Sequence, residues 1–563
     1  MKSYSIKTQI GILAAAVCLL FSGCALEDEW YSETTPGTFF RTKEDVYKVL
    51  NRPFTHLFWY DVGQRPPRRW YLQEMTADQM SMPTRGEDWY DGGHFVRLHS
   101  HNWTPDESSI SDTWRGTAMG IALTIECRTD LERLDYPSLG LTEKDKADHV
   151  NQLNALIGYF YLRGLDFFGA FPIFTDLTKP AEGRSKAEKV YAHTEGLLNN
   201  ALENLYPKEA GSEASSVISR GAAATLLARL YFNAESYIGE EHYAECAKLC
   251  EEIIGGEYGK YELDENWYGP FSFNNRQSQA LIWALPSRNT DQEMFDMFYR
   301  YGFHYNKKLV YEGLFQPYNG FGLTPSHAPD GSSYTYKLNG PFSKFNDNDL
   351  RKKQYVYQGG GKYVGMLMRD AQLKPDGTPV TCIRAGYSGK PLVLVDYVAL
   401  MSTLQPGQSP STLRSSMLDG EEPSLYRLAK FPVAPKEDEN CWAAFFPMIR
   451  LEEVYYMLAE CRMRAGLKKE AADLINEVRS RAFENKADPD PVTKDNLDKY
   501  RMVDEWGIEF LGEGRRRTDL IRWGLFLTEE WWDHKASNDP SRLVFPVPTT
   551  AIAGNNKLAD EPI

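Results

Sequence analysis

One stretch near the C-terminus carries the strongest indication of the fold: EWGIEFLGEGRRRTDLIRWG, from Glu505 to Gly524. Its three acids recur every fourth residue, so one side of a helix is expected to present all of them. Arginines and an aspartate follow at once. Acids and arginines this close indicate a buried or half-buried ion-pair network joining the last helices. The expected members are Glu505, Glu509, Glu513, Arg515, Asp519 and Arg522.

The same acid row has a catalytic interpretation, because paired carboxylates carry out glycoside hydrolysis. The arginines beside the row, which include Arg516 and Arg517, argue against that interpretation, since they would neutralise the acids. We therefore predict a structural role for the row, no catalytic residue and no enzyme activity. A glycoside hydrolase that uses these acids remains the alternative.

Helical patterns continue on both sides of this stretch. Two predicted helix pairs, 221–234 with 243–254 and 448–465 with 469–482, alternate small and large residues as tetratricopeptide units do. The pairs lie far apart and their spacing is not that of a regular repeat, so a uniform solenoid is not expected. A tetratricopeptide scaffold that binds only proteins is a further alternative. The remaining predicted helices are 112–134, 150–168 and 186–205.

Between the helix pairs the character of the chain changes. Residues 256–446 are rich in Gly, Pro, Tyr and Asn, with a short strand expected at 281–285 and a tight turn at 374–377. The fold class predicted is mostly α: a scaffold of helix pairs with a long, loop-rich insertion that carries short strands. The expected division is an N-terminal helical part at 39–255, the insertion at 256–446 and a C-terminal helical part at 447–563, packed as one unit.

The N-terminus has the pattern of a processing signal. Lys2 and Lys7 precede an apolar run at 10–21, which is too short to cross a bilayer and typical of a signal peptide. The run ends in Phe-Ser-Gly-Cys, as bacterial lipoprotein signals do. We predict a signal peptide at 1–23, lipidation of Cys24 and a tether at 24–38. An ordinary secreted protein with an incidental cysteine is the alternative.

Composition excludes several classes of protein. The chain has 563 residues, of which 42% are hydrophobic and 25% charged, which is a globular composition. Its net charge of −15 and lack of a basic stripe argue against nucleic-acid binding, and against anionic lipid surfaces as partners of the protein body. The cysteines beyond Cys24 form no CxxC motif and no regular disulfide framework. They are Cys127, Cys246, Cys250, Cys382, Cys441 and Cys461.

Several motifs, taken in order, resemble the SusD/RagB family. Besides the stretch quoted first, they are GYFYLRGLDFFGAFP at 158–172, IRLEEVYYMLAE at 449–460, INEVRSRA at 475–482 and FPVP at 545–548. The chain departs from the family pattern at Phe510, where a basic residue is frequent, and in the tail after Gly554. The acids at 27–29 resemble the export signal of lipoproteins that reach the outer face of the outer membrane.

The resemblance implies a lipid-anchored protein on the exterior of the outer membrane, where it forms a lid on a SusC-like TonB-dependent transporter. Most members capture oligosaccharides or polysaccharides, whereas a RagB-like branch handles peptides, which leaves a peptide-binding lid as the alternative within the family. Members are not known as enzymes, and no cofactor is implied.

Sugar-binding sites need flat aromatic rings on exposed loops, with polar groups nearby to bond the hydroxyls. The Gly-rich loop 84–93, the turn 316–321 and the segment 266–269 have this composition, and we expect the first two to meet on one exposed face. In the family, the loop before the long helix near Trp114 contributes to the ligand face. For each ring, packing of its loop onto the scaffold is the alternative. The candidates are Arg85, Asp88, Trp89, Tyr90, Trp103, Trp267, Tyr318 and Asn319.

Metal binding is not expected. His99 and His101 could hold a metal if they lay on a strand, and His94 is close in sequence, but no acid or cysteine completes a ligand set. The acidic segment 347–349 lacks the glycine and the closing Glu of a calcium loop.

Overall fold

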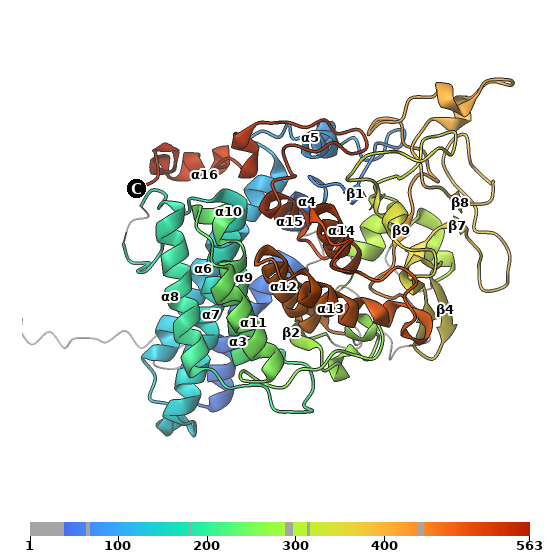
Figure 1. Cartoon of the computed structure of the whole chain (residues 1–563). Coiled ribbons are helices and arrows are strands. Elements are labelled where there is room, and N and C mark those ends of the chain that lie inside the picture. Colours follow the sequence, from blue (N-terminus) through green and yellow to red (C-terminus); the bar gives the residue numbers. More distant parts are fainter. Residues whose placement is uncertain are drawn as a thin grey trace, which may run out of the picture.

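The computed structural model describes residues 39–62, 68–179, 182–287, 295, 297–311, 316–435, 438 and 444–563. The predicted signal peptide, lipidation site and tether lie outside these residues. Helices fill one side of the molecule, and loops with short strands form the other (Figure 1). No helix within the described ranges is long and apolar enough to cross a membrane.

Helix α7 lies at the centre of the helical side. Its N-terminus has a capping box, in which the Thr142 hydroxyl accepts a hydrogen bond from the Asp145 N–H and Asp145 bonds back to the cap. From Asn151 to Phe168 almost every residue is buried, and the helix ends at Gly169. The helices of the N-terminal part are α3 (Lys43–Asp61), α4 (Arg68–Glu74), α5 (His94–His99), α6 (Ser108–Glu132), α7 (Glu143–Phe168), α8 (Ala187–Asn204), α9 (Arg220–Phe232), α10 (Ala234–Ile238) and α11 (Tyr243–Gly255).

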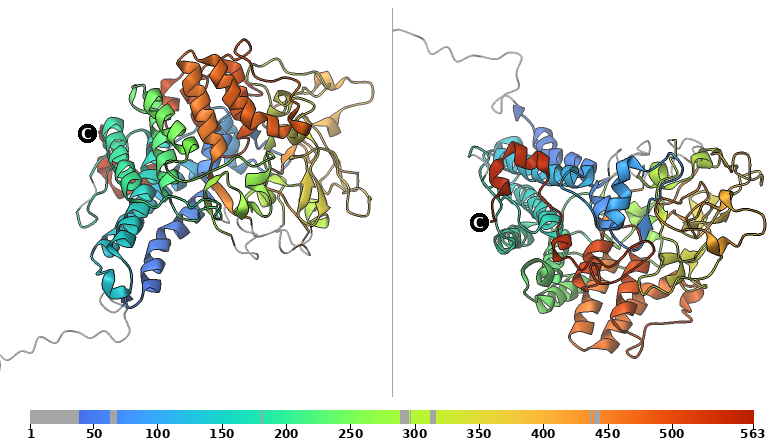
Figure 2. Two further views of the ribbon diagram at one scale, coloured as in Figure 1. Left: turned by 60° about the horizontal axis from the view of Figure 1, so that its bottom comes forward. Right: turned by 90° about the horizontal axis from the view of Figure 1, so that it is seen from above.

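The two predicted helix pairs form one continuous row. α9 packs on α11, α11 packs on α12 (Leu451–Arg464), and α12 packs on α13 (Lys468–Arg479). α11 and α12 are adjacent although the whole insertion separates them in sequence (Figure 2). The structure therefore confirms the mostly helical scaffold with an irregular insertion.

The strands are short and pair in twos. β2 (Leu281–Leu285) lies where a strand was predicted, and it pairs antiparallel with β10 (Phe446–Arg450). Because residues 446–450 are extended, α12 begins later than the predicted helix. The other pairs are β1 (Met80–Ser81) with β3 (Gly322–Leu323), β4 (Val356–Gly359) with β5 (Lys362–Val364), β6 (Leu367–Met368) with β9 (Arg427–Leu428), and β7 (Asp370–Ala371) with β8 (Val393–Leu394).

The C-terminal stretch differs from the prediction in one respect. α14 (Lys499–Glu509) ends before Glu513, so Glu513 does not share a helix with Glu505 and Glu509. Gly512 and Gly514, with φ of 77° and 71°, turn the chain there. α15 (Arg516–Arg522) follows, and α16 (Thr549–Gly554) lies near the C-terminus.

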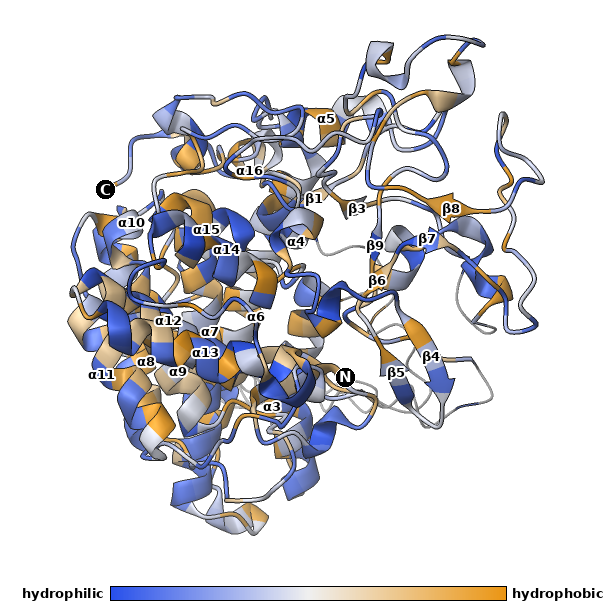
Figure 3. Cartoon of the chain, turned by 45° about the vertical axis from the view of Figure 1, so that its right-hand side comes forward, coloured by the Kyte–Doolittle hydropathy of each residue, from blue (hydrophilic) through white to orange (hydrophobic). Residues whose placement is uncertain are grey.

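Hydrophobic and hydrophilic residues alternate around the helices, and the apolar faces meet in a shared core (Figure 3). Trp114 belongs to this core, where its ring contacts Phe168 and Phe171 at centroid distances of 4.9 and 4.6 Å. The same core includes residues of the insertion, such as Phe431 and Leu425, so the insertion is packed onto the helical scaffold.

Candidate functional site

The acids Glu509 and Glu513 are held in ion pairs inside the protein. Arg450 lies between them, with Nη1 2.6 Å from Glu509 Oε1 and Nη2 2.8 Å from Glu513 Oε1. Arg351 binds the second oxygen of Glu509 at 2.7 Å. Burial favours the neutral acid, but Arg450 and Arg351 outweigh burial and hold the pKa of Glu509 at about 2. Buried carboxylates that are already bonded to cations are poorly suited to act as acids in hydrolysis.

The six expected members of the network all form ion pairs, but the arginines next to the row in sequence pair mostly with acids outside the row. Glu505 binds Arg479 and Arg501, each at 2.9 Å. Arg515 instead pairs with Asp519 and Glu453, and Arg522 pairs with Glu460 and Asp519. The chain turns at Gly512–Gly514, so Arg515 and Arg522 point away from the row. Arg450 and Arg351, which come from distant segments, pair with Glu509 instead.

The structure brings the loop 84–93 and the turn 316–321 together. The Trp89 indole N–H donates a hydrogen bond to the Tyr318 carbonyl oxygen at 2.9 Å. The indole also lies over Gly320, so closely that a Cβ at that position would be 3.0 Å from Trp89 Cζ2. Tyr301, from the π-helix Met297–Gly302, lies 6.0 Å from the Trp89 ring and 5.7 Å from the Tyr318 ring, between centroids.

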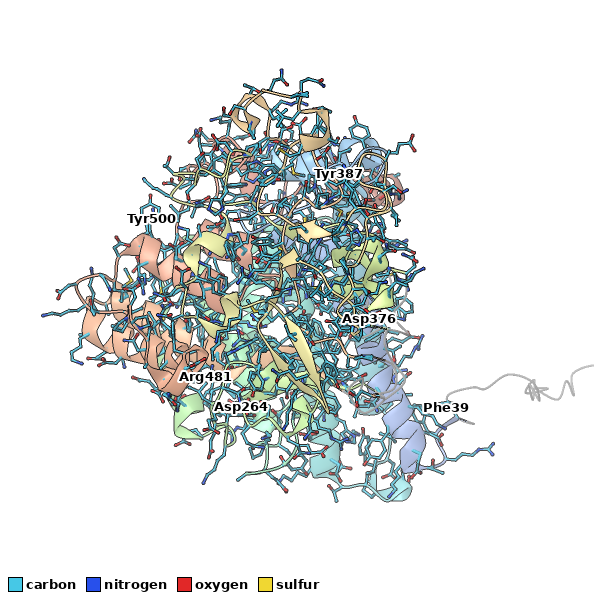
Figure 4. All side chains as sticks on the ribbon, turned by 90° about the vertical axis from the view of Figure 1, so that its right-hand side faces the viewer. Phe39, Asp264, Asp376, Tyr387, Arg481 and Tyr500 are labelled. Atoms are coloured by element: carbon cyan, nitrogen blue, oxygen red, sulfur yellow. The ribbon has the colours of Figure 1, made fainter. Side chains whose placement is uncertain are left out.

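One tyrosine from each of the two loops is open to solvent. Tyr90 is 52% exposed and Tyr318 is 38% exposed, whereas Trp89 is half-buried. We call Trp89, Tyr301 and Tyr318 the aromatic face, and Tyr90 follows Trp89 in the loop 84–93 with its hydroxyl near Gly93. Its loops belong to the part of the molecule that lies away from Phe39, where the described chain begins. Tyr387, on the neighbouring loop 382–390, appears in the upper part of Figure 4 and Phe39 at the lower right.

Where the two loops meet, Trp89 and Asn319 have a strained backbone. Trp89 has a φ of 66° and Asn319 a φ of 54°, in the left-handed region that non-glycine residues rarely adopt. Such strain persists only where surrounding contacts enforce it, and it is concentrated at functional sites.

Arg85 and Asn319 lie beneath the aromatic face, which corrects their prediction as ligand contacts. Both are buried. Arg85 Nη1 donates to the Gly320 carbonyl at 2.6 Å, and the Asn319 amide donates to the Glu422 carbonyl at 2.9 Å. Asn319 Oδ1 accepts a hydrogen bond from Arg427 at 2.7 Å. These hydrogen bonds hold the turn 316–321 in its conformation, and the two side chains do not extend to the surface.

Asp88 lies at the surface beside Trp89. Its Oδ2 accepts the Tyr305 hydroxyl hydrogen bond and lies 2.7 Å from Arg384 Nη2. The Arg384 guanidinium also lies over the Tyr305 ring, 4.8 Å from the centroid. Sequence reasoning missed Arg384 and Tyr305, because both reach Asp88 only through the fold.

Trp103 and Trp267 are not surface residues, so their prediction as ligand contacts is wrong. Trp103 is 3% exposed and packs on Phe545, and Trp267 is 4% exposed and packs on Tyr268. For these two rings the alternative of packing a loop onto the scaffold is the correct one.

The three histidines considered in the sequence are buried, and each forms a hydrogen bond within the protein. His94 binds Glu107 at 2.6 Å, and His99 and His101 bond the carbonyls of Trp532 and Thr76. His99 ends helix α5 and is not on a strand. Burial lowers the pKa of His101 to about 3.

Another cluster brings metal-ligating residue types together, namely His304, Cys382 and Glu422, whose ligand atoms lie within 4.8 Å of one another. His304 Nδ1 accepts a hydrogen bond from the Asn306 N–H at 3.1 Å, so Nε2 carries the proton and donates to Glu422 at 2.8 Å. A metal-bound histidine ordinarily donates from its other nitrogen. The cluster therefore fits a hydrogen-bonded support better than a metal site.

Comparisons with known proteins agree on one family. The model of the SusD family matches residues 274–558. The starch-binding protein SusD of Bacteroides thetaiotaomicron is 24% identical over 493 residues, which cover 84% of this chain and 81% of that protein. The SusD-like protein P25 of Formosa agariphila is 31% identical over 478 residues, 80% of this chain and 78% of that protein.

Solved structures show the same fold. Surface glycan-binding protein A from Bacteroides thetaiotaomicron aligns with a TM-score of 0.64 at 17% identity, over 92% of this chain and 98% of that one. A laminarin-binding SusD-like protein aligns with a TM-score of 0.62 at 16% identity, over 91% and 98% of the two chains.

Proposed function

Because the chain belongs to the SusD family, we propose that it is a cell-surface lipoprotein that captures a glycan and delivers it to a SusC-like TonB-dependent transporter in the outer membrane. In this proposal Cys24 carries the lipid anchor, and the protein binds without catalysing a reaction. Relatives named for binding starch, laminarin and surface glycans support a glycan ligand.

The proposal rests on the contact between the loop 84–93 and the turn 316–321, in which the Trp89 indole N–H donates a hydrogen bond to the Tyr318 carbonyl oxygen. A pyranose ring has an apolar C–H face that stacks on an aromatic ring and polar edges that need hydrogen bonds. The aromatic face supplies the exposed Tyr318 ring, and Asp88 with Arg384 supplies hydrogen-bonding groups at its edge.

Native affinity electrophoresis on a panel of polysaccharides, followed by calorimetric titration, tests the ligand. We expect Trp89→Ala and Tyr318→Ala each to weaken glycan binding by about 1–3 kcal/mol, by analogy with base stacking, which is about 5- to 150-fold. Trp59→Ala is the matched control, since this exposed aromatic lies on α3, outside the two loops. Wild-type affinity in both test variants would refute this site, and binding confined to a parallel peptide panel would refute the glycan.

The transporter is tested separately. Purification of the tagged, full-length protein from outer membranes should bring down a TonB-dependent transporter in stoichiometric amounts. Recovery of the protein alone from gently solubilised membranes would contradict this part of the proposal.

A further inference from the structure

A cavity of about 90 Å³ lies where helices from both ends of the chain meet. At about 10–15 Å³ for each water, it has room for roughly six to nine water molecules. Helices α3, α4, α7 and α9 line it, together with β10 and the turn at Gly512–Gly514. Among the described residues, five arginines and four acids face it. The cavity is therefore strongly polar, and its content depends on which of these charges are already paired.

Three of the five arginines are held by acids. Arg229 binds both oxygens of Glu453, at 2.7 and 2.6 Å. Arg515 and Arg450 pair with the acids described above. Carboxylates therefore offset the charges of these three arginines and fix their positions at the wall of the cavity.

The other two arginines, Arg69 and Arg163, share a single carboxylate. Arg69 Nε donates to Asp61 Oδ1, and Asp61 Oδ2 accepts the hydrogen bond of the Tyr159 hydroxyl at 2.6 Å. Arg163 Nε in turn donates to the Tyr159 hydroxyl oxygen at 3.2 Å. This chain of hydrogen bonds brings both guanidiniums close to Asp61, and one carboxylate offsets only one of their two positive charges.

Each of these two guanidiniums keeps two nitrogens without a partner. In the part of the chain that the structure describes, Nη1 and Nη2 of Arg69 and of Arg163 donate to no residue. Arg69 is 6% exposed, and its Nη1 is buried without a hydrogen bond. Buried polar groups are nearly always hydrogen-bonded, and an unsatisfied one is costly. Free donors beside a cavity therefore indicate that the cavity holds a hydrogen-bond acceptor.

The neighbouring charges leave the excess in place. Asp166 accepts hydrogen bonds from the neutral groups of Gln73 and Thr518, at 2.5 and 2.7 Å. Buried Arg517 donates to the Asp166 backbone carbonyl at 2.9 Å and adds a further positive charge there. Burial raises the pKa of the nearby Glu74 to about 7, so this acid is only partly ionised at neutral pH. Three guanidiniums therefore lie near two carboxylates and one partly protonated acid.

We propose that Arg69 and Arg163 bind a small oxyanion in this cavity, namely a carboxylate or an inorganic phosphate or sulfate. A planar guanidinium presents paired N–H donors that match two oxygens of one such anion. The anion offsets the excess positive charge, satisfies the free donors and connects α4 with α7. The site is separate from the aromatic face, and its existence does not depend on the proposed glycan-binding function.

The first experiment is thermal unfolding of the full-length protein in dilute Tris–HCl with added phosphate, sulfate, acetate or chloride at matched ionic strength. We expect at least one oxyanion to raise the melting temperature saturably, by about 2–3 °C at a concentration 100-fold above its dissociation constant. Chloride should raise it less, because one spherical ion does not match paired donors. Ion chromatography of the denatured protein detects an oxyanion that co-purifies, expected at about one per chain. Equal shifts with all four salts would overturn the inference, as would no shift together with no released oxyanion.

The second experiment repeats these measurements with variants. Arg163→Gln should fold, because Arg163 forms no ion pair within the described ranges, and should bind the oxyanion about 10- to 100-fold more weakly. Arg220→Gln is the matched control, since Arg220 is likewise half-buried, donates from Nε to one carbonyl oxygen at 2.9 Å and lies outside the cavity. Arg69→Lys retains the charge beside Asp61 but lacks paired donors, so it should also weaken binding. A wild-type response in Arg163→Gln would overturn the inference.

A third measurement locates the ligand directly. Selenate is an oxyanion whose selenium gives an anomalous X-ray signal, so crystals of the protein soaked in selenate show where it binds. One selenate between Arg69 and Arg163 is expected in the wild type, and none at that position in Arg163→Gln. A cavity that holds only water in the wild type would refute the site, even if selenate binds elsewhere on the surface.

Discussion

Replacement of Glu509 by Gln tests whether the acid row is structural. The pKa of Glu509 is held at about 2 against an ordinary value of 4.5, because Arg450 and Arg351 outweigh the effect of burial. At about 1.4 kcal/mol per pH unit, this depression corresponds to about 3 kcal/mol of folding stability at neutral pH. Removal of one partner from a buried ion pair costs a similar amount, about 3–5 kcal/mol.

The expected change in melting temperature follows from chain size. Unfolding entropy is about 2 cal/mol/K per residue, or about 1 kcal/mol/K for about 500 folded residues, if the chain unfolds in one step. The melting temperature of Glu509→Gln should therefore fall by about 3–4 °C in calorimetry at pH 7, with glycan affinity unchanged. Glu484→Gln is the control, because Glu484 is exposed and pairs with Lys353 at the surface, and it should change stability by less than about 0.5 kcal/mol.

The pH dependence has a defined sign. A carboxylate with a depressed pKa stabilises the folded state above its unfolded pKa, and this stabilisation is lost as the pH falls from about 4.5 towards 2. The difference between wild type and Glu509→Gln should therefore shrink below pH 4.5. An unchanged melting temperature at pH 7 together with lost activity towards a glycan would refute the structural role and favour the enzyme.

Three further predictions concern separate parts of the chain. Trp114→Ala should lower the free energy of unfolding by about 3–5 kcal/mol in urea titration, since it leaves a cavity against Phe168 and Phe171, and a loss below about 1 kcal/mol would contradict this. Burial lowers the pKa of His101 to about 3 and of His534 to about 2, so their neutral forms support folding fully above pH 6.5 and this support declines as the pH falls. Denaturation midpoints from pH 7 to 4 should show the decline, and His534→Gln should flatten it. Cys24→Ala should abolish labelling by a palmitate analogue, and a variant that still labels and floats with outer membranes would exclude Cys24 as the anchor.

Helical periodicity predicted the scaffold well where apolar residues form a stripe. The predicted helix 186–205 is matched by α8 (Ala187–Asn204). The helix predicted from residue 150 begins instead at Glu143. Its first two turns are mostly polar, so they carry no apolar stripe that would have indicated a helix. The available signal was the Thr142–Asp145 capping box, which specifies a helix start without any apolar stripe.

The sequence could predict which loops form the candidate site, but not which of their side chains are exposed. Loop composition indicated Trp89, Tyr90 and Tyr318, but the exposure of a ring depends on what covers it. Trp103 is covered by Phe545, a residue distant in sequence. Arg384 and Arg450 likewise reach their acids only in the folded chain, whereas Arg515 was misleading because it is close in sequence and its side chain points elsewhere.

The contact between α11 and α12 has a consequence for the order of folding. The apolar side of α11 belongs to the core, with Cys246, Leu249, Cys250 and Ile253. Two helices pack on α11: α9, which precedes it, and α12, which begins only at Leu451. During synthesis or export, the side of α11 that packs on α12 therefore stays uncovered until the insertion and α12 have followed. Contacts so distant in sequence slow folding and leave partly folded chains prone to aggregation. A chain truncated before Leu451 should accordingly bind chaperones or precipitate rather than form a stable N-terminal half.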